Sequence, residues 1–225
     1  TPRRARPGLP GAAAPVARFV HCMSPRAWPH ACLLLIAGSA LVWLLAANDA
    51  VPPDWLIWRF DGWRQQPWTL WTGPLLHLVL PHAIANALAL AALAVLGAAL
   101  AVPPRDALAL LLAWPLGTLA LLWVPGVGAS YGLGGAVHAA AASLAVRTLQ
   151  NPDTRVLGLL VAGGLLIKLR LERAWAVPIG FDSGWAFNVI YAAHLTGAVA
   201  GAALALLLEA CHRLFGRRPP RAAVD

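Results

Sequence analysis

Residues 107–146 read ALALLLAWPLGTLALLWVPGVGASYGLGGAVHAAAASLAV and contain no aspartate, glutamate, lysine or arginine. A helix needs about 20 mostly apolar residues to cross a bilayer, so this stretch is too long for one crossing and long enough for two. Pro125, Gly126 and Gly128 interrupt it, and proline and glycine mark breaks between helices. The stretch therefore predicts two membrane-spanning helices, near 107–123 and 132–149.

The same argument, applied outward from this pair, predicts four more spans. No charged residue lies between Arg26 and Asp49, or between Arg64 and Arg105. Lysine and arginine at the end of a span can extend to the interface, so Lys168 does not exclude a span before it. The chain is therefore expected to be an all-α polytopic membrane protein with a six-helix bundle. The four further spans are 28–47, 80–101, 156–171 and 189–208.

The composition excludes several classes of protein. Hydrophobic residues make up 60% of the 225 residues and charged residues only 12%, whereas a soluble domain carries about 25% charged residues. A soluble globular enzyme, a disordered chain and a secreted disulfide scaffold are therefore excluded. The net charge of +8 does not indicate nucleic-acid binding, because the excess lies in the terminal segments and short loops.

Charge also predicts the domain organisation and the orientation. We expect a basic cytoplasmic tail at 1–27, a membrane domain at 28–210 and a second basic cytoplasmic tail at 211–225, with both tails lying against anionic lipid. Six spans place both termini on one side. If that side is cytoplasmic, the positive-inside rule is satisfied, because the inner segments hold most of the basic residues. These are Arg3, Arg4, Arg6, Arg18, Arg26, Arg105, Arg147, Arg155, Arg213, Arg217, Arg218 and Arg221.

Two outer loops are expected to carry structure. The first contains Trp55, Trp58, Trp63, Trp68 and Trp71, and indole rings settle at membrane interfaces, so we interpret it as a structure in the outer interface. The loop at 173–188 is either a lid over the site or a plain interfacial connector.

Polar side chains inside spans are costly and indicate function by default. His77, His82 and Asn86 are placed on the outer half of the second span, and His82 and Asn86, four residues apart, share a helix face. The first turns of the fourth span, Gly132 to His138, and His194 of the sixth span come at the same depth. The sequence therefore predicts a polar pocket in the outer half of the bundle.

Other interpretations were weighed for individual residues. His138 is interpreted as a packing residue, and Gly197 and Gly201 as small residues at a helix contact. No carboxylate falls within the predicted spans and no HExxH motif occurs, which argues against a metal site and against a transporter. No cofactor is expected.

The polar residues resemble motifs of the rhomboid family of intramembrane serine proteases. Residues 77–86, HLVLPHAIAN, are similar to the family's H-x4-H-x3-N, and residues 193–201, AHLTGAVAG, to its A-H-x-x-G-x3-G. The resemblance implies a rhomboid-like bundle with the catalytic serine on the fourth span and the catalytic histidine on the sixth. It assigns the general base to His194 and oxyanion or supporting roles to His82, Asn86 and His77.

The rhombosortase branch of the family is the closer resemblance. It is carried by Trp71-Thr72-Gly73, by Lys168 with Glu172, and by residues 132–138, GLGGAVH, which are similar to the branch's G-L-S-G-V-L-H. The nucleophile position in this motif is Gly134, with Gly132 and Gly135 as motif glycines. A further departure is Thr69 after Trp68, where the branch often has an arginine that would anchor the outer loop.

Glycine at position 134 implies an inactive chain, because losing a serine nucleophile costs roughly 10⁶-fold in rate. Ser130 is a weak substitute, since it lies a full turn outside position 134. The chain is therefore expected to be an engineered Ser-to-Gly variant, which the intact surroundings favour, or a natural pseudoprotease that binds membrane helices without cleaving them. A native gene encoding Gly134 would indicate the pseudoprotease.

The branch resemblance also implies a substrate and a location. The substrates would be exported proteins with a C-terminal tail that contains a Gly-rich motif, one membrane helix and basic residues. Glycine makes local unwinding of the substrate helix cheap, which cleavage requires. We expect a bacterial inner-membrane protein, N-in and C-in, whose active site opens to the periplasmic side.

Overall fold

The computed structural model describes residues 26–184 and 187–215 of the chain. Of the two predicted tails, 1–27 and 211–225, residues 1–25 and 216–225 lie outside the described residues. The last helix continues to Phe215, five residues past the predicted end of the membrane domain at 210. Its final turn therefore belongs to the segment that was expected to be a tail.

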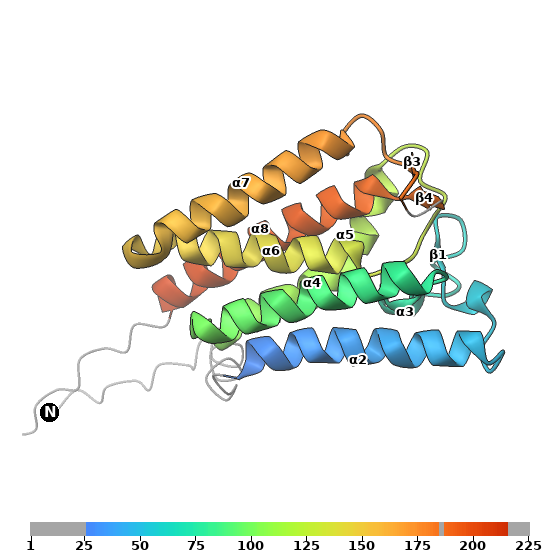
Figure 1. Cartoon of the computed structure of the whole chain (residues 1–225), viewed down its shortest axis with the longest axis horizontal. Coiled ribbons are helices and arrows are strands. Elements are labelled where there is room, and N and C mark those ends of the chain that lie inside the picture. The colour runs from blue at the N-terminus through green and yellow to red at the C-terminus, as the bar shows by residue number, and fades with distance from the viewer. Residues whose placement is uncertain (1–25, 185–186, 216–225) are drawn as a thin grey trace, which may run out of the picture.

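Six long helices form the described part of the molecule (Figure 1). Four of the described helical segments, Ala27–Ala47, Leu80–Ala99, Pro104–Trp123 and Tyr191–Phe215, are long and apolar enough to cross a membrane. Of the other two, one has 17 residues, and the other has charged residues at both ends. The prediction of an all-α polytopic membrane protein is confirmed. The helices are α2 (Ala27–Ala47), α4 (Leu80–Ala99), α5 (Pro104–Leu119), α6 (Gly134–Gln150), α7 (Arg155–Glu172) and α8 (Tyr191–Phe215).

The helices run back and forth between two ends of one bundle (Figure 1). α2 begins and α8 ends at the same end, so the described chain starts and finishes on one side of the bundle. α6 is central and packs against α8, α7 and α5, while α2 packs mainly against α4. We call the end where α4, α6 and α8 begin the site end, and the opposite end the ion-pair end.

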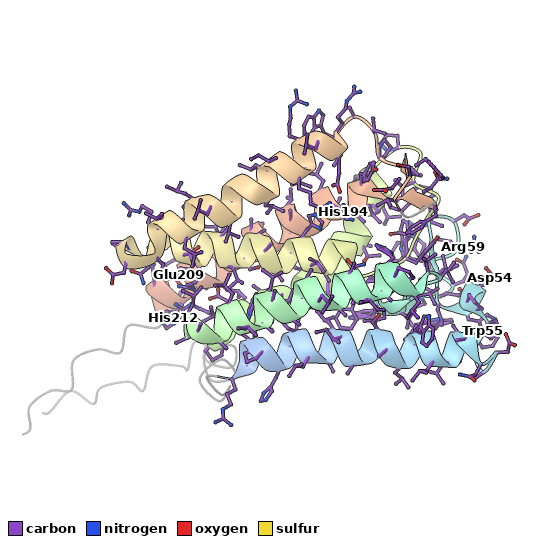
Figure 2. The ribbon with its side chains drawn as sticks, viewed as in Figure 1. Asp54, Trp55, Arg59, His194, Glu209 and His212 are labelled. Atoms are coloured by element: carbon purple, nitrogen blue, oxygen red, sulfur yellow. The ribbon has the colours of Figure 1, made fainter. Side chains whose placement is uncertain are left out.

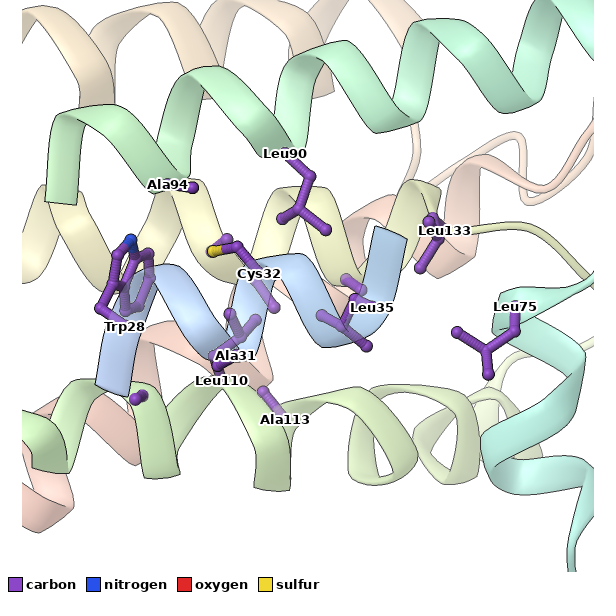
Figure 3. Close-up of a cluster of buried hydrophobic side chains, with 14 of the residues drawn as sticks. Trp28, Ala31, Cys32, Leu35, Leu75, Leu90, Ala94, Leu110, Ala113 and Leu133 are labelled. Atoms are coloured by element: carbon purple, nitrogen blue, oxygen red, sulfur yellow. The ribbon is translucent and has the colours of Figure 1, made fainter. Parts of the chain in front are cut away.

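The apolar core lies where α2 faces α4, α5 and α6 (Figure 3). Trp28, Cys32 and Leu35 of α2 and Leu90 of α4 have no exposed surface. The indole of Trp28 donates to the Leu93 carbonyl at 2.9 Å, and its ring lies where a Cβ on Gly97 would be. Large apolar side chains on α7 are instead mostly exposed, as expected for a helix that faces lipid. They include Val156, Leu159, Leu160, Leu166, Ile167 and Leu171.

Short elements close the site end of the bundle. The tryptophan-rich segment forms a 3₁₀ turn, η1 (Pro53–Trp55), strand β1 (Trp58–Arg59) and helix α3 (Thr69–Leu75). β1 pairs antiparallel with β2 (Ala129–Ser130), and β3 (Gly180–Asp182) pairs antiparallel with β4 (Phe187–Val189). Two further 3₁₀ turns are η2 (Ala120–Trp123) and η3 (Pro152–Thr154).

Tryptophan and threonine side chains anchor the tryptophan-rich segment. Trp68 Nε1 donates to the Trp55 carbonyl at 2.8 Å, and Thr72 Oγ1 donates to the Leu56 carbonyl at 3.0 Å. Trp114 of α5 donates to the Trp71 carbonyl at 3.1 Å. These bonds to backbone oxygens hold the segment together without an arginine at position 69.

The ion-pair end corrects the expectation that the bundle holds no carboxylate. α5 begins at residue 104 and α8 extends to 215, so Asp106 and Glu209 fall inside helices and are buried. Arg147 Nε lies 2.7 Å from one Asp106 oxygen, and its Nη2 lies 3.0 Å from Glu209 Oε2. The expectation was wrong because the predicted spans were ended at charged residues. A helix can continue past a charged residue when that residue forms an ion pair.

Candidate functional site

A small pocket lies at the site end of the bundle. Its volume is about 20 Å³, which is room for roughly one water molecule. Strand β4 and the residue after it contribute four of the lining residues. A ligand larger than a water molecule requires the pocket to widen. The lining residues are His82, Tyr131, Gly132, Gly134, Gly135, Phe187, Asn188, Val189, Ile190, Ala193 and His194.

Gly134 and His194 face each other across the pocket. Gly134 is the first residue of α6, and His194 lies in the first turn of α8 (Figure 2). A Cβ placed on Gly134 would come within 2.5 Å of His194 Nε2. The imidazole therefore occupies the space in which a side chain at position 134 would begin, and its Nε2 atom points to that position.

His194 is held from two further directions. Its Nδ1 atom lies 2.9 Å and 3.0 Å from the two carboxylate oxygens of Glu172, the last residue of α7. The ring of His138 stacks on the ring of His194, with centroids 4.1 Å apart and planes 9° apart. His138 Nδ1 donates to the Gly134 carbonyl at 2.7 Å. The histidine interpreted as a packing residue thus lies directly against the site.

A chain of hydrogen bonds runs from α2 to the pocket. The hydroxyl of Ser39 donates to the Leu75 carbonyl at 2.9 Å and lies 3.0 Å from His77 Nδ1. Asn86 Nδ2 lies 3.2 Å from His77 Nε2 and 3.0 Å from His82 Nε2, so the amide can donate one hydrogen to each ring. The chain fixes the orientation of His82, the member that lines the pocket.

His77 is neutral in this arrangement. Its Nε2 atom accepts from the Leu133 backbone N–H at 3.3 Å, which requires the tautomer with the proton on Nδ1. Burial, and to a smaller extent the neighbouring His82, lower the pKa of His77 to about 4. His77 therefore acts as an acceptor that ties the connector before α4 to the start of α6.

The beginning of α6 borders the pocket through Gly134 and Gly135. The first N–H groups of a helix have no acceptor within the helix. In α6 the N–H of Leu133 goes to His77, and the next such groups belong to residues 134–136. N–H groups at a helix start stabilise negative charge, which an oxyanion site requires.

Glycines bring α6 and α8 into backbone contact. A Cβ on Gly135 would lie 2.9 Å from the Ala193 carbonyl oxygen, and Cβ atoms on Gly197 and Gly201 would overlap the carbonyl oxygens of Gly135 and Ala139. This contact sets the separation between position 134 and His194. Gly132 precedes α6 with a φ of +96°, a left-handed conformation in which a side chain would be strained.

The structure brings most of the predicted site residues together. His82, Gly134 and His194 line one pocket, while Asn86 and His77 lie behind it and hold its wall. His77 was expected within the second span and instead lies in the connector between α3 and α4, outside the helix. Proline at position 81, in the first turn of α4, explains where the helix begins.

Two residues at the site were given no role there by sequence reasoning. Ser39 gives no signal in the sequence, because a serine in an apolar span is common. Glu172 was named only with Lys168 as part of the branch resemblance and lay just past the predicted span 156–171, yet its side chain is only 11% exposed and reaches His194. Its spacing of four residues from Lys168 was the available signal, and Lys168 Nζ lies 2.7 Å from its carboxylate.

Ser130 does not line this pocket. It lies in β2, paired with Trp58, and borders a neighbouring hollow with Pro74 and Gly117.

A metal site is disfavoured by the geometry of the histidines. Ligand atoms of His138, Glu172 and His194 lie within 4.8 Å of one another, as a metal site would need. However, the two rings are stacked and nearly parallel, so the in-plane lone pairs of their nitrogens do not converge on one point. The carboxylate is also already paired with the Lys168 ammonium group.

The family profile of the rhomboid domain matches residues 64–210, more than half of the chain. The match runs from before α3 almost to the end of α8 and includes every residue of the pocket. No curated protein matches the chain.

Proposed function

The chain belongs to the rhomboid family of intramembrane serine proteases, and we propose that its site is that of an intramembrane serine endopeptidase whose nucleophile position is Gly134. One distance supports this most directly, namely the 2.5 Å between His194 Nε2 and a Cβ placed on Gly134. A serine here would put its hydroxyl within reach of an imidazole nitrogen, which is the pairing that nucleophilic catalysis needs. With glycine the chain has no nucleophile and is inactive.

The remaining residues divide the catalytic work in an active, serine-containing form. His194 Nε2 takes the proton of the serine hydroxyl while the oxygen attacks the scissile carbonyl carbon, and then gives it to the departing amine nitrogen as the C–N bond breaks. Water cleaves the resulting ester by the same route. The N–H groups at the start of α6 and His82 stabilise the oxyanion, and Asn86 and His77 orient His82.

The proposed substrates are exported proteins with a C-terminal tail composed of a Gly-rich motif, a membrane helix and basic residues. The resemblance to the rhombosortase branch suggests this class. Gly134 and Gly135 line the pocket without side chains, which supports the close approach of an extended, glycine-containing segment near the cut. The β3–β4 hairpin is the proposed lid that moves to admit it.

The proposed location is a bacterial inner membrane, with both termini cytoplasmic and the site opening to the periplasm. Two observations support this orientation. The described chain begins and ends at the ion-pair end of the bundle, opposite His194. Most of the lysine and arginine residues lie in the segments assigned to that side, as the positive-inside rule requires.

The second candidate is a natural pseudoprotease that binds membrane helices without cutting them. The fit between Gly134 and His194 favours it, because the imidazole already fills the space of a side chain at 134. This candidate predicts that the native gene encodes glycine at position 134 and that membrane clients bind without any product. The engineered-variant proposal predicts a serine codon there.

The decisive experiment restores the nucleophile. The Gly134→Ser protein is expressed in membranes together with a reporter that carries a Gly-rich motif, one membrane helix and a basic tail. We expect cleavage by Gly134→Ser, none by the parent chain, and none by the double variant Gly134→Ser/His194→Ala. A shift of the His194 ring by a fraction of an ångström is needed to admit the side chain.

Either result is informative. Cleavage that requires both the introduced serine and His194 establishes the protease chemistry. A well-folded Gly134→Ser protein that binds the reporter helix without cutting it contradicts the proposal and favours the pseudoprotease.

A further inference from the structure

The catalytic pair implied by the family resemblance has a third group behind it. The Glu172 carboxylate lies on the far side of the His194 ring from position 134, with both oxygens within 3.0 Å of Nδ1. Both side chains are about nine-tenths buried. These distances are those of a hydrogen bond to a charged acceptor, which is among the stronger kinds in proteins.

This contact determines which nitrogen of His194 carries the proton. A carboxylate only accepts hydrogen bonds, so Nδ1 must be the protonated nitrogen of the neutral ring. Nε2 then has a free lone pair, and Nε2 is the atom that points to position 134. The tautomer that a general base requires is thus selected by Glu172.

The carboxylate and the ring have further neighbours. Lys168, one turn earlier on α7, contacts Glu172 Oε1 at 2.7 Å and supplies a positive charge beside it. α7 ends directly after Glu172, where Arg173 adopts a left-handed conformation with φ of 51°. His138 covers one face of the His194 ring. The imidazole is therefore held at its edge by Glu172 and on its face by His138.

We infer that Glu172 is a positioning residue that completes a Ser–His–Glu triad when position 134 is serine. This inference rests on the proposed function. Glu172 receives no proton during the reaction; it keeps Nδ1–H oriented and stabilises the imidazolium that forms when Nε2 takes the serine proton. The two-residue dyad expected from the family resemblance would then be incomplete as a description of this chain.

The first test does not depend on protease activity. Nitrogen-15 NMR of labelled histidine, in the Gly134 protein in micelles, reports which ring nitrogen carries the proton. We expect the Nδ1–H tautomer for His194, assigned by comparison with His194→Ala. In Glu172→Gln we expect this preference to be lost, because an amide can donate as well as accept. A preserved Nδ1–H tautomer in Glu172→Gln overturns the inference.

The second test uses the Gly134→Ser background. Glu172→Gln is expected to lower kcat by roughly 10²–10⁴-fold with KM changed less than about threefold, because the group acts on the chemical step. Glu172→Asp, which keeps the charge, should recover at least about tenfold of that loss. Lys168→Met is the matched control, since it removes the partner on the same carboxylate and leaves the His194 contact, so kcat should change less than about fivefold.

The outcomes separate the two proposals. No cleavage by Gly134→Ser contradicts the proposed protease function, while the NMR experiment still decides the role of Glu172 in selecting the tautomer. Cleavage by Gly134→Ser with an unchanged kcat in Glu172→Gln overturns the triad and leaves the protease assignment standing. An equal loss in Glu172→Gln and Lys168→Met would show that the ion pair, rather than the contact with His194, matters.

Discussion

Both ends of the bundle contain a buried polar cluster, and the two clusters are built differently. At the ion-pair end, Arg147 bridges Asp106 and Glu209, and Arg105 also contacts Glu209 at 2.7 Å. At the site end, histidines and an asparagine are joined by hydrogen bonds around a pocket that contains His194. Figure 2 shows Glu209 and His194 toward opposite ends of the bundle.

The difference lies in what is left unpaired. Each carboxylate at the ion-pair end has a guanidinium partner, so this cluster fastens α5, α6 and α8 and offers no open group. At the site end, His138 Nε2 is buried without a hydrogen-bond partner among the described residues, and Gly134 brings no polar side chain to His194 Nε2, which points at it. A cluster in which every polar group has a partner indicates a structural role. A cluster with unpaired polar groups indicates a site that acts on a ligand.

The largest effect is expected from breaking the ion-pair end. Arg147→Met leaves the almost fully buried Asp106 carboxylate without its main partner, and such losses cost about 3–5 kcal/mol. The free energy of unfolding, measured by denaturant titration in mixed micelles, should fall by this amount. Arg213→Met is the matched control: its side chain is 62% exposed and pairs with the same Glu209, so its loss should stay below about 1 kcal/mol. Equal losses of unfolding free energy in the two variants would contradict the distinction between the buried and the exposed ion pair.

A smaller effect, and one on chemistry rather than stability, is expected at the site end. In the Gly134→Ser background, Asn86→Ala removes the donor that orients His82, and kcat should fall about 10²-fold. Reporter cleavage under single-turnover conditions measures the change. Asn86→Ala must retain the thermal unfolding midpoint of its parent within a few degrees. If the midpoint falls instead and kcat is unchanged, Asn86 belongs with the structural residues.

The smallest effect is the loss of stability expected when the pH is lowered. His77 has a pKa lowered to about 4 in the folded protein, against an ordinary value of 6.5, so the unfolded chain binds a proton that the folded chain does not as pH falls below 6.5. The resulting loss of stability is about 2 kcal/mol between about pH 7.5 and about pH 5. His77→Gln, which can still bond to Leu133 and Ser39, should remove that part of the pH dependence. Identical pH dependence in the two proteins would show that folding does not lower the pKa of His77.

Much of the fold could be predicted because its signal is local. The predicted spans at 28–47 and 80–101 agree with α2 and α4 to within two residues, since the length of an apolar stretch alone sets the length of a membrane helix. The depth of the site in the membrane could also be predicted from each segment separately, because the direction in which a span crosses shows at which end its first residues lie. His82, Gly134 and His194 each come in the first turn of a helix that begins at the same end.

The errors concern contacts between helices. Asp106 and Glu209 were placed outside the spans because each is a charge at the end of an apolar stretch, and their partners come from other helices. The interpretation of His138 as a packing residue is not contradicted, but a single histidine in a span does not reveal which ring it packs against. The stack on His194 depends on the close approach of α6 and α8 at their glycines.

The sequence by itself determined that this chain is a helical membrane protein, where its helices lie, and which polar residues share one depth. These properties follow from the cost of placing charge and open backbone in a bilayer, which acts on each segment separately. Only the tertiary structure decided that His194 points its Nε2 at position 134 and its Nδ1 at Glu172. Those distances depend on how α6, α7 and α8 pack, and packing is set by the shapes of surfaces that lie far apart in the sequence.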